Sequence, residues 1–172
     1  NIRLIAAVDK VAASGGYMMA CVADRIIAAP FAIIGSIGVV AQLPNFNRLL
    51  KKHDIDFELI TAGKYKRTLT MFGENTDEQR QKFREELEEA HRLFMQFVKE
   101  NRAAVDIEST ATGEYRYGTR ALDQKLVDEL LTSDDYLSRA ADGSDIYELE
   151  YKRKKHVSEK IFGPAAKLFL SE

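Results

Sequence analysis

Short apolar runs separated by turn residues constrain the fold of this chain more than any other feature of its sequence. Four runs of strand length cover residues 2–9, 25–30, 32–40 and 57–63. Two helix candidates lie among them, at 16–23 and 44–54. Buried parallel strands form continuous apolar runs, and helical segments connect them. The alternation therefore predicts an α/β domain with largely parallel strand pairing.

The second half of the chain opens with an amphipathic helix predicted over 77–100. Thr76 and Gln79 form a capping-box pattern at its start. Apolar side chains then follow at steps of three and four, namely Phe83, Leu87, Ala90, Phe94 and Phe97. Such a stripe is typical of a core or subunit-contact face. Further on we predict a helix over 119–130, a helix capped by Ser133 and an edge strand over 145–152.

Charge and cysteine content narrow the function classes. Lysine and arginine total 25 and aspartate and glutamate 27, so the formal charge is −2 and nothing favours a nucleic-acid partner. Cys21 is the only cysteine, and the three histidines match no zinc spacing, so we expect no disulfide, no metal and no cofactor. A length of 172 residues fits one domain.

The sequence contains no recognisable leader or membrane span. It opens directly in a strand-like run, without a basic leader or a cleavage site, which suggests a fragment whose N-terminal part is missing. The longest uncharged stretch, residues 26–47, contains two prolines and two glycines. A spanning helix needs about 20 mainly apolar residues without such breaks, so two buried strands around a turn explain this stretch better.

Ser14 is the candidate nucleophile of the sequence. It lies in the segment KVAASGGYMMA, after the first strand-like run and before the first helix candidate. Small neighbours would let a carbonyl approach its hydroxyl, and the start of the helix would direct N–H groups toward developing negative charge. The pattern loosely matches the small-x-Ser-x-Gly turn of known nucleophiles. A serine that caps the helix explains the same residues, so both interpretations stay open at this point.

A serine nucleophile needs a base, and two kinds of residue offer one. All three histidines lie among charged residues and are most simply solvated, namely His53, His91 and His156. A lysine can act as the base when burial favours its neutral form. Lys64 and Lys66 both follow Gly63 in a polar loop, and most lysines in such a loop are simply solvated.

Three ordered motifs resemble those of the signal peptide peptidase A family of Ser–Lys serine peptidases, and in particular its SohB-like branch. They are ASGGY at 13–17, GSIGV at 35–39 and GKYK at 63–66. The likeness covers residues 1 to about 130, and the segment after the lysine motif departs from the usual family pattern. It implies a spiral of βα units, as in crotonase and the Clp protease, within a single catalytic domain over 1–172.

The resemblance assigns roles to individual residues. Ser14 would be the nucleophile, and Lys66, 52 residues further on, its general base. The Gly15 N–H would be half of an oxyanion hole, whose other half in relatives comes from an earlier loop. Ser36 would hold the lysine amine in place. An extended substrate would pair with the surrounding segment, through Gly35, Ile37, Gly38 and Val39.

The resemblance also implies substrates and surroundings. Family members cleave membrane-derived, signal or unfolded peptides, and an N-terminal transmembrane segment anchors them. We therefore expect the bacterial inner membrane, with the catalytic domain on the periplasmic side. Relatives form homo-oligomeric rings in which the serine and the lysine can come from neighbouring subunits. The basic run 152–156 is expected to be a solvated face, with contact to anionic lipid as the alternative.

Two other functions compete with a peptidase. A crotonase-like enzyme would bind acyl-CoA and stabilise an enolate without a serine nucleophile, but the ASGGY segment offers no obvious acidic residue for that chemistry. A non-catalytic, ring-forming scaffold at the membrane would keep the fold and lose turnover. The presence of both Ser14 and Lys66 argues against each of these alternatives. The sequence thus predicts a serine endopeptidase that acts through an acyl-enzyme.

Overall fold

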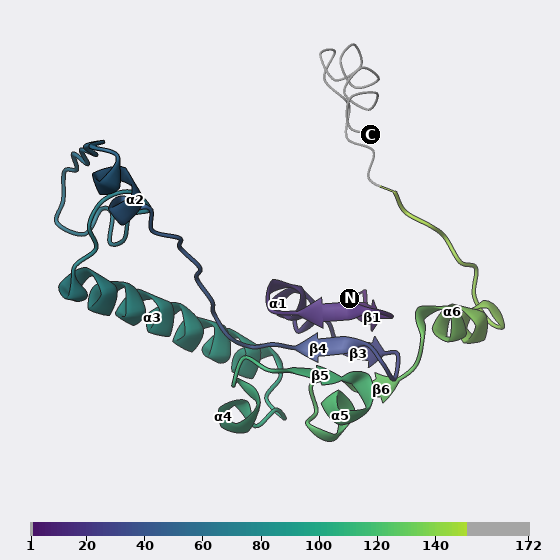
Figure 1. Ribbon diagram of the computed structural model, residues 1–172. Coiled ribbons are helices and arrows are strands. Elements are labelled where there is room, and N and C mark those ends of the chain that lie inside the picture. The colour runs from purple at the N-terminus through teal and green to yellow at the C-terminus, as the bar shows by residue number, and fades with distance from the viewer. Residues whose placement is uncertain (1, 151–172) are drawn as a thin grey trace, which may run out of the picture. The chain divides into compact units, whose positions relative to one another are not determined.

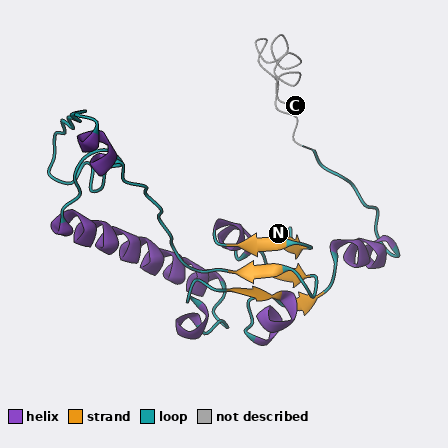
Figure 2. Cartoon of the chain, viewed as in Figure 1, coloured by secondary structure: helices purple, strands orange, loops and turns teal. Residues whose placement is uncertain are grey.

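The computed structural model describes residues 2–150, and two compact units divide the chain after Tyr136. The strands are β1 (Ile5–Val8), β2 (Val11–Ala13), β3 (Arg25–Ala28), β4 (Ile33–Gly35), β5 (Tyr115–Tyr117) and β6 (Glu129–Leu130). The helices are α1 (Gly15–Ala20), α2 (Asn47–Lys52), α3 (Asp77–Asn101), α4 (Ile107–Thr110), α5 (Gly118–Asp123) and α6 (Ser133–Ala141) (Figure 1). Helices and strands thus mix along the chain (Figure 2), which confirms the predicted α/β class.

Two small sheets form the frame of the first unit. One has the strand order β1-β3-β6, with both of its pairings parallel. In the other, β4 lies between β2 and β5 and pairs with β2 in parallel and with β5 antiparallel. Pairing is therefore mainly parallel, as predicted. Because parallel neighbours end at the same side of a sheet, the residues that follow β2 and β4 lie close together. The spiral arrangement of βα units stays a prediction.

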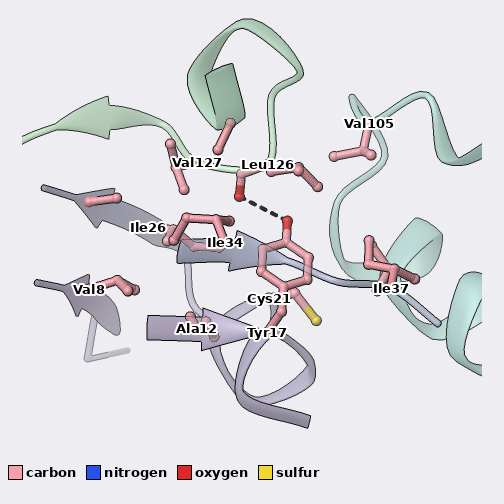
Figure 3. Packing of buried hydrophobic residues seen from close by; sticks show 14 of the residues in the cluster. Val8, Ala12, Tyr17, Cys21, Ile26, Ile34, Ile37, Val105, Leu126 and Val127 are labelled. Carbon is pink, nitrogen blue, oxygen red and sulfur yellow. Dashed lines mark hydrogen bonds between the residues drawn. The ribbon is translucent and has the colours of Figure 1, made fainter. Parts of the chain in front are cut away.

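A buried tyrosine fixes helix α1 against the core. Tyr17 is fully buried, and its hydroxyl donates a 2.8 Å hydrogen bond to the carbonyl of Leu126, which precedes β6 (Figure 3). Ile26 of β3 and Ile34 of β4 belong to the same buried cluster. Burying an aromatic ring with its hydroxyl satisfied anchors an element strongly. Ser14, three residues before Tyr17, is therefore held by a helix that cannot easily shift.

Helix α3 matches its prediction closely. The hydroxyl of Thr76 accepts from the Gln79 N–H, and the Gln79 side chain accepts from the Thr76 N–H, so the predicted capping box is present. The apolar stripe is only partly core. Phe94 is buried, as is Val98, whereas Ala90 is exposed and the other members of the stripe are half-buried. The C-terminal half of α3 therefore packs on the core, and its N-terminal half stays more open.

Backbone conformation shortens two predicted elements. The strand predicted over 32–40 ends at Gly35, because Gly35 and Ser36 have φ angles of +87° and +49°, outside the extended region. The helix predicted over 119–130 is split into α5 and β6. Lys125, with a φ of +61°, ends the helical path and turns the chain back toward β3, with which β6 pairs.

Two predicted strands are absent from the described residues. Residues 57–63 and 145–150 have no regular secondary structure, although both carry the apolar and β-branched residues typical of strands. Strand propensity takes effect only where a neighbouring strand can pair, and none of the described strands pairs with either segment. Residues 151–152 of the second strand, together with the basic run and His156, lie outside the described residues.

The remaining differences are small. The predicted strand over 2–9 is confined to β1, and the helices predicted over 16–23 and 44–54 shorten to α1 and α2. The hydroxyl of Thr132, rather than Ser133, caps α6 by accepting from the Asp135 N–H at 3.1 Å. No helix between residues 2 and 150 is long and apolar enough to cross a membrane.

Candidate active site

Ser14 stands on a strained turn between β2 and α1. Its φ and ψ angles are 52° and −121°, a region that residues other than glycine rarely adopt. Its N–H donates to the Gly35 carbonyl at 2.8 Å, and its carbonyl accepts from the first turn of α1, so the conformation is held from both sides. Backbone strain of this kind costs about 1–3 kcal/mol and tends to gather at functional sites.

The hydroxyl of Ser14 does not cap the helix. The side chain makes no capping hydrogen bond, although Ser14 occupies the N-cap position of α1, and the residue is exposed. The structure therefore argues against the capping interpretation of the sequence. Gly15 and Gly16 follow, and a Cβ atom added at either would meet nothing within 4 Å. Open space before the hydroxyl would let a bulky substrate reach it.

A cavity of about 460 Å³ opens beside Ser14, and its walls come from segments far apart in the sequence. Its lining residues include Ser14, Ser36, Gly38, Val39, His91 and Gly113. The structure therefore gathers the predicted nucleophile, the predicted positioning serine and part of the predicted substrate segment. Ile37 of that segment is fully buried, and Gly35 ends β4.

The segment after β4 continues toward the chain that leads into β5. The Ser36 N–H donates to the Glu114 carbonyl at 3.0 Å, and the Gly113 N–H donates to the Ile37 carbonyl at 3.0 Å. The Ser36 hydroxyl donates to the Gly113 carbonyl, also at 3.0 Å. A hydroxyl has one donor and two acceptor sites, so the Ser36 oxygen can still accept from an ammonium group. These contacts fix the segment from one side.

His91 is a cavity residue that sequence reasoning missed. The sequence favours a solvated residue of the long helix at this position, but His91 is half-buried and its Nε2 atom lies 3.3 Å from the Ile37 carbonyl oxygen. Among the described residues that line the cavity, it is the only titratable one. His91 lies four residues after Leu87 and three before Phe94, a spacing that puts the three residues on one face of the helix. This spacing is the sequence signal that places His91 beside the core face.

Lys66 is not brought to this cavity. It is exposed, and it lies between Lys64, which pairs with Glu78 at 2.9 Å, and Thr68, whose hydroxyl donates to Glu86 at 3.0 Å. Both glutamates belong to the first half of α3, whereas His91, which lines the cavity, lies further along the helix. Glu78 and His91 are separated by about 20 Å along the helix axis at 1.5 Å per residue. The single chain therefore does not join Lys66 to Ser14.

The two neighbouring lysines differ in their surroundings. The Tyr65 hydroxyl and the Glu78 carboxylate raise the pKa of Lys64 above its ordinary value, which favours the charged form. Its ammonium also lies 4.9 Å from the centroid of the Tyr65 ring. Lys66 forms no ion pair with any carboxylate in the described part of the chain. A general base must lose its proton, so the surroundings of Lys64 do not suit that role.

A serine on a strained strand-to-helix turn, with an open cavity before it, is typical of α/β enzymes with a serine nucleophile. The model of peptidase family S49 matches residues 1–147. The chain therefore belongs to peptidase family S49.

Individual relatives place the chain within that family. It is 56% identical over 161 residues to the probable protease SohB of Haemophilus influenzae, covering 94% of this chain and 46% of that protein. The probable protease SohB of Buchnera aphidicola from Acyrthosiphon pisum is 59% identical over 161 residues, covering 94% of this chain and 48% of that protein. The chain is thus SohB-like, and it spans about half the length of the curated relatives that it matches.

Proposed function

We propose that this chain is the catalytic part of a serine endopeptidase that uses Ser14 as nucleophile and Lys66 as general base. The observation that carries the proposal is Ser14 itself, with its strained backbone and a hydroxyl that caps no helix. Membership of family S49 and the likeness to SohB proteases support the peptidase class. The role of Lys66 rests on the family motif and on the ion pair that holds its neighbour Lys64.

The chemistry proceeds in two steps. The Lys66 amine takes the proton of the Ser14 hydroxyl while the Ser14 oxygen attacks the peptide carbonyl carbon, and the Gly15 N–H donates to the resulting oxyanion. As the C–N bond breaks, Lys66 returns the proton to the leaving amine, and an acyl-enzyme remains. Lys66 then deprotonates a water molecule, which attacks the ester. As the ester C–O bond breaks, Lys66 returns that proton to the Ser14 oxygen, and the acid and the free serine are released.

The lysine needs two changes before it can act in this way. It must approach Ser14, and it must leave water, because an apolar environment favours a neutral amine. A neighbouring subunit that covers the cavity would supply both changes. We therefore propose a homo-oligomer in which the Lys66 of one subunit serves the Ser14 of the next. The Ser36 oxygen would accept from the Lys66 amine and hold it in place.

The proposed substrates are membrane-derived, signal or unfolded peptides bound in an extended conformation. Gly35, Ile37, Gly38 and Val39 belong to the segment that would pair with such a peptide. Gly35 itself is paired with Ala13 at the end of β2, and from Ser36 on no described strand pairs with the segment on the side toward β2. An N-terminal anchor in the bacterial inner membrane, with the catalytic domain on the periplasmic side, completes the proposal.

The experiment compares the full-length protein with three variants, Ser14→Ala, Lys66→Met and Lys64→Met. Each is treated with a fluorophosphonate probe and with casein. We expect labelling and cleavage to disappear in Ser14→Ala, cleavage to fall at least about 10³-fold in Lys66→Met, and Lys64→Met to remain active. Activity that survives in Ser14→Ala or Lys66→Met contradicts the dyad. Acyl-CoA binding without labelling would favour the crotonase-like alternative, and the absence of both signals would favour a scaffold.

A further inference from the structure

The backbone around Ile37 leaves one N–H group without a partner on the side of Ser14. The Ile37 carbonyl is directed toward β5, where it accepts from the Gly113 N–H. The described chain contains no cis peptide bond, and in a trans peptide the carbonyl and the next N–H point in opposite directions. The Gly38 N–H is therefore directed away from β5, toward the side of the sheet on which β2 ends, just before Ser14. Within residues 2–150 it donates to no protein acceptor.

His91 holds the same peptide plane from the helix. Its Nε2 lies 3.3 Å from the Ile37 oxygen, which can only accept, so Nε2 carries the hydrogen in this contact. The carbonyl thus receives two donors, one from the loop before β5 and one from α3. Gly38 has no side chain to fix its conformation, so these two contacts, together with its close approach to Gly113, restrain the orientation of its N–H.

We infer that His91 is a positioning residue for peptide binding. By donating to the Ile37 carbonyl, it keeps the Gly38 N–H directed into the cavity, where that N–H donates to a backbone carbonyl of an extended peptide lying beside Ser14. The inference rests on the proposed peptidase function, since it names the group that would hold the substrate of that site. His91 acts through Ile37 and Gly38 and does not act as a base.

Two amide variants separate this role from other roles of a histidine. The side-chain nitrogen of His91→Gln can reach the position of Nε2, whereas that of His91→Asn is one methylene too short. Both variants are polar, and neither can act as a base at neutral pH. Loss of one partly buried hydrogen bond corresponds to about 1 kcal/mol, or roughly a fivefold change in an equilibrium constant. We therefore expect His91→Asn to lose about five- to tenfold in peptide affinity and His91→Gln to stay within about twofold of the parent.

The first measurement is a binding assay that needs no turnover. Full-length Ser14→Ala protein is titrated with a fluorescent, unfolded casein peptide, and the two double variants with His91→Gln and His91→Asn are compared with it. Weaker binding for His91→Asn alone supports the inference. Equal affinity for all three proteins, or an equal loss in both double variants, would overturn it. Melting temperatures of the three proteins show whether any loss reflects unfolding.

The second measurement is the pH profile of cleavage in the proteins that keep Ser14. A positioning role leaves the shape of the profile unchanged in His91→Gln and raises KM more than it lowers kcat in His91→Asn. If the cleavage activity of His91→Gln no longer falls at low pH, the inference is overturned, because the imidazole would then be the base. If the Ser14→Ala protein binds peptide in the first assay but the protein that keeps Ser14 cleaves none in the second, the proposed function fails while the binding result still decides the role of His91.

Discussion

Gly38 and Gly113 approach each other so closely that a Cβ atom added at position 38 would lie 2.8 Å from the Gly113 Cα atom. Gly113 has a φ angle of +82°, so both glycines are required where the segment after β4 meets the chain before β5. This contact explains in physical terms why the GSIGV motif carries its second glycine.

We predict that Gly38→Ala weakens peptide cleavage and destabilises the protein by about 1–3 kcal/mol, the usual cost of forcing an extra methyl group into a packed contact. Urea unfolding and casein cleavage test the two effects. Gly143→Ala is the matched control, because a Cβ atom added there meets nothing within 4 Å. Equal stability of the two variants would contradict the close approach.

Ser14→Gly should stabilise the protein while removing its activity. A glycine adopts the φ of +52° without steric cost, so the free energy of unfolding should rise by about 1 kcal/mol. Ser138→Gly provides the control, because the same exchange in the exposed helix α6 should lower stability by a few tenths of a kcal/mol. Thermal unfolding measures both variants. A lower melting temperature for Ser14→Gly would show that the turn is not strained.

Activity should return when two inactive variants share one oligomer. If the dyad forms between neighbouring subunits, co-expressed Ser14→Ala and Lys66→Ala chains should recover about a quarter of wild-type cleavage. In a ring of head-to-tail contacts, each site needs an intact serine from one subunit and an intact lysine from the next. Random mixing supplies each of these about half of the time. The control replaces the Lys66→Ala chain by one carrying both substitutions, so that no intact serine is present. Absence of recovery in a verified mixed oligomer would place the dyad within one chain.

Asp128 makes part of the stability dependent on pH. Burial opposes its charge, but hydrogen bonds from the Arg102 guanidinium, at 2.6 and 3.0 Å, and from the Ile26 N–H outweigh that effect and hold the pKa of Asp128 below its ordinary value. A lowered carboxyl pKa contributes stability above the ordinary pKa of about 4, and this contribution is lost as the pH falls through the folded-state pKa.

We therefore predict that Asp128→Asn costs about 1–2 kcal/mol at pH 7 and that its deficit relative to wild type shrinks below about pH 4. Urea unfolding from pH 7 to pH 3 measures the difference. Asp142→Asn, at an exposed position outside helix α6, should follow the wild-type curve. A deficit for Asp128→Asn that is constant with pH would contradict the assignment.

Much of the local structure could be predicted from the sequence because local patterns encode it. The Thr76–Gln79 capping box and the apolar period of α3 depend on residues within a few turns of one another. The capping box and the helix are confirmed, whereas the apolar stripe lies only partly in the core. The same is true of the turn at Ser14, where small residues follow a strand. Residues 57–63 show the limit, since their strand-like composition cannot form a strand without a partner.

The sequence by itself determined the α/β class, the long helix and the positions of Ser14, Ser36 and Lys66 in family order. Only the tertiary structure decided that His91 reaches Ile37 across 54 residues, that Gly38 packs on Gly113, and that Lys66 lies away from Ser14. The reason is physical. Periodicity and capping act between neighbours along the chain, whereas the walls of the cavity meet only after the sheets and α3 have packed around one core.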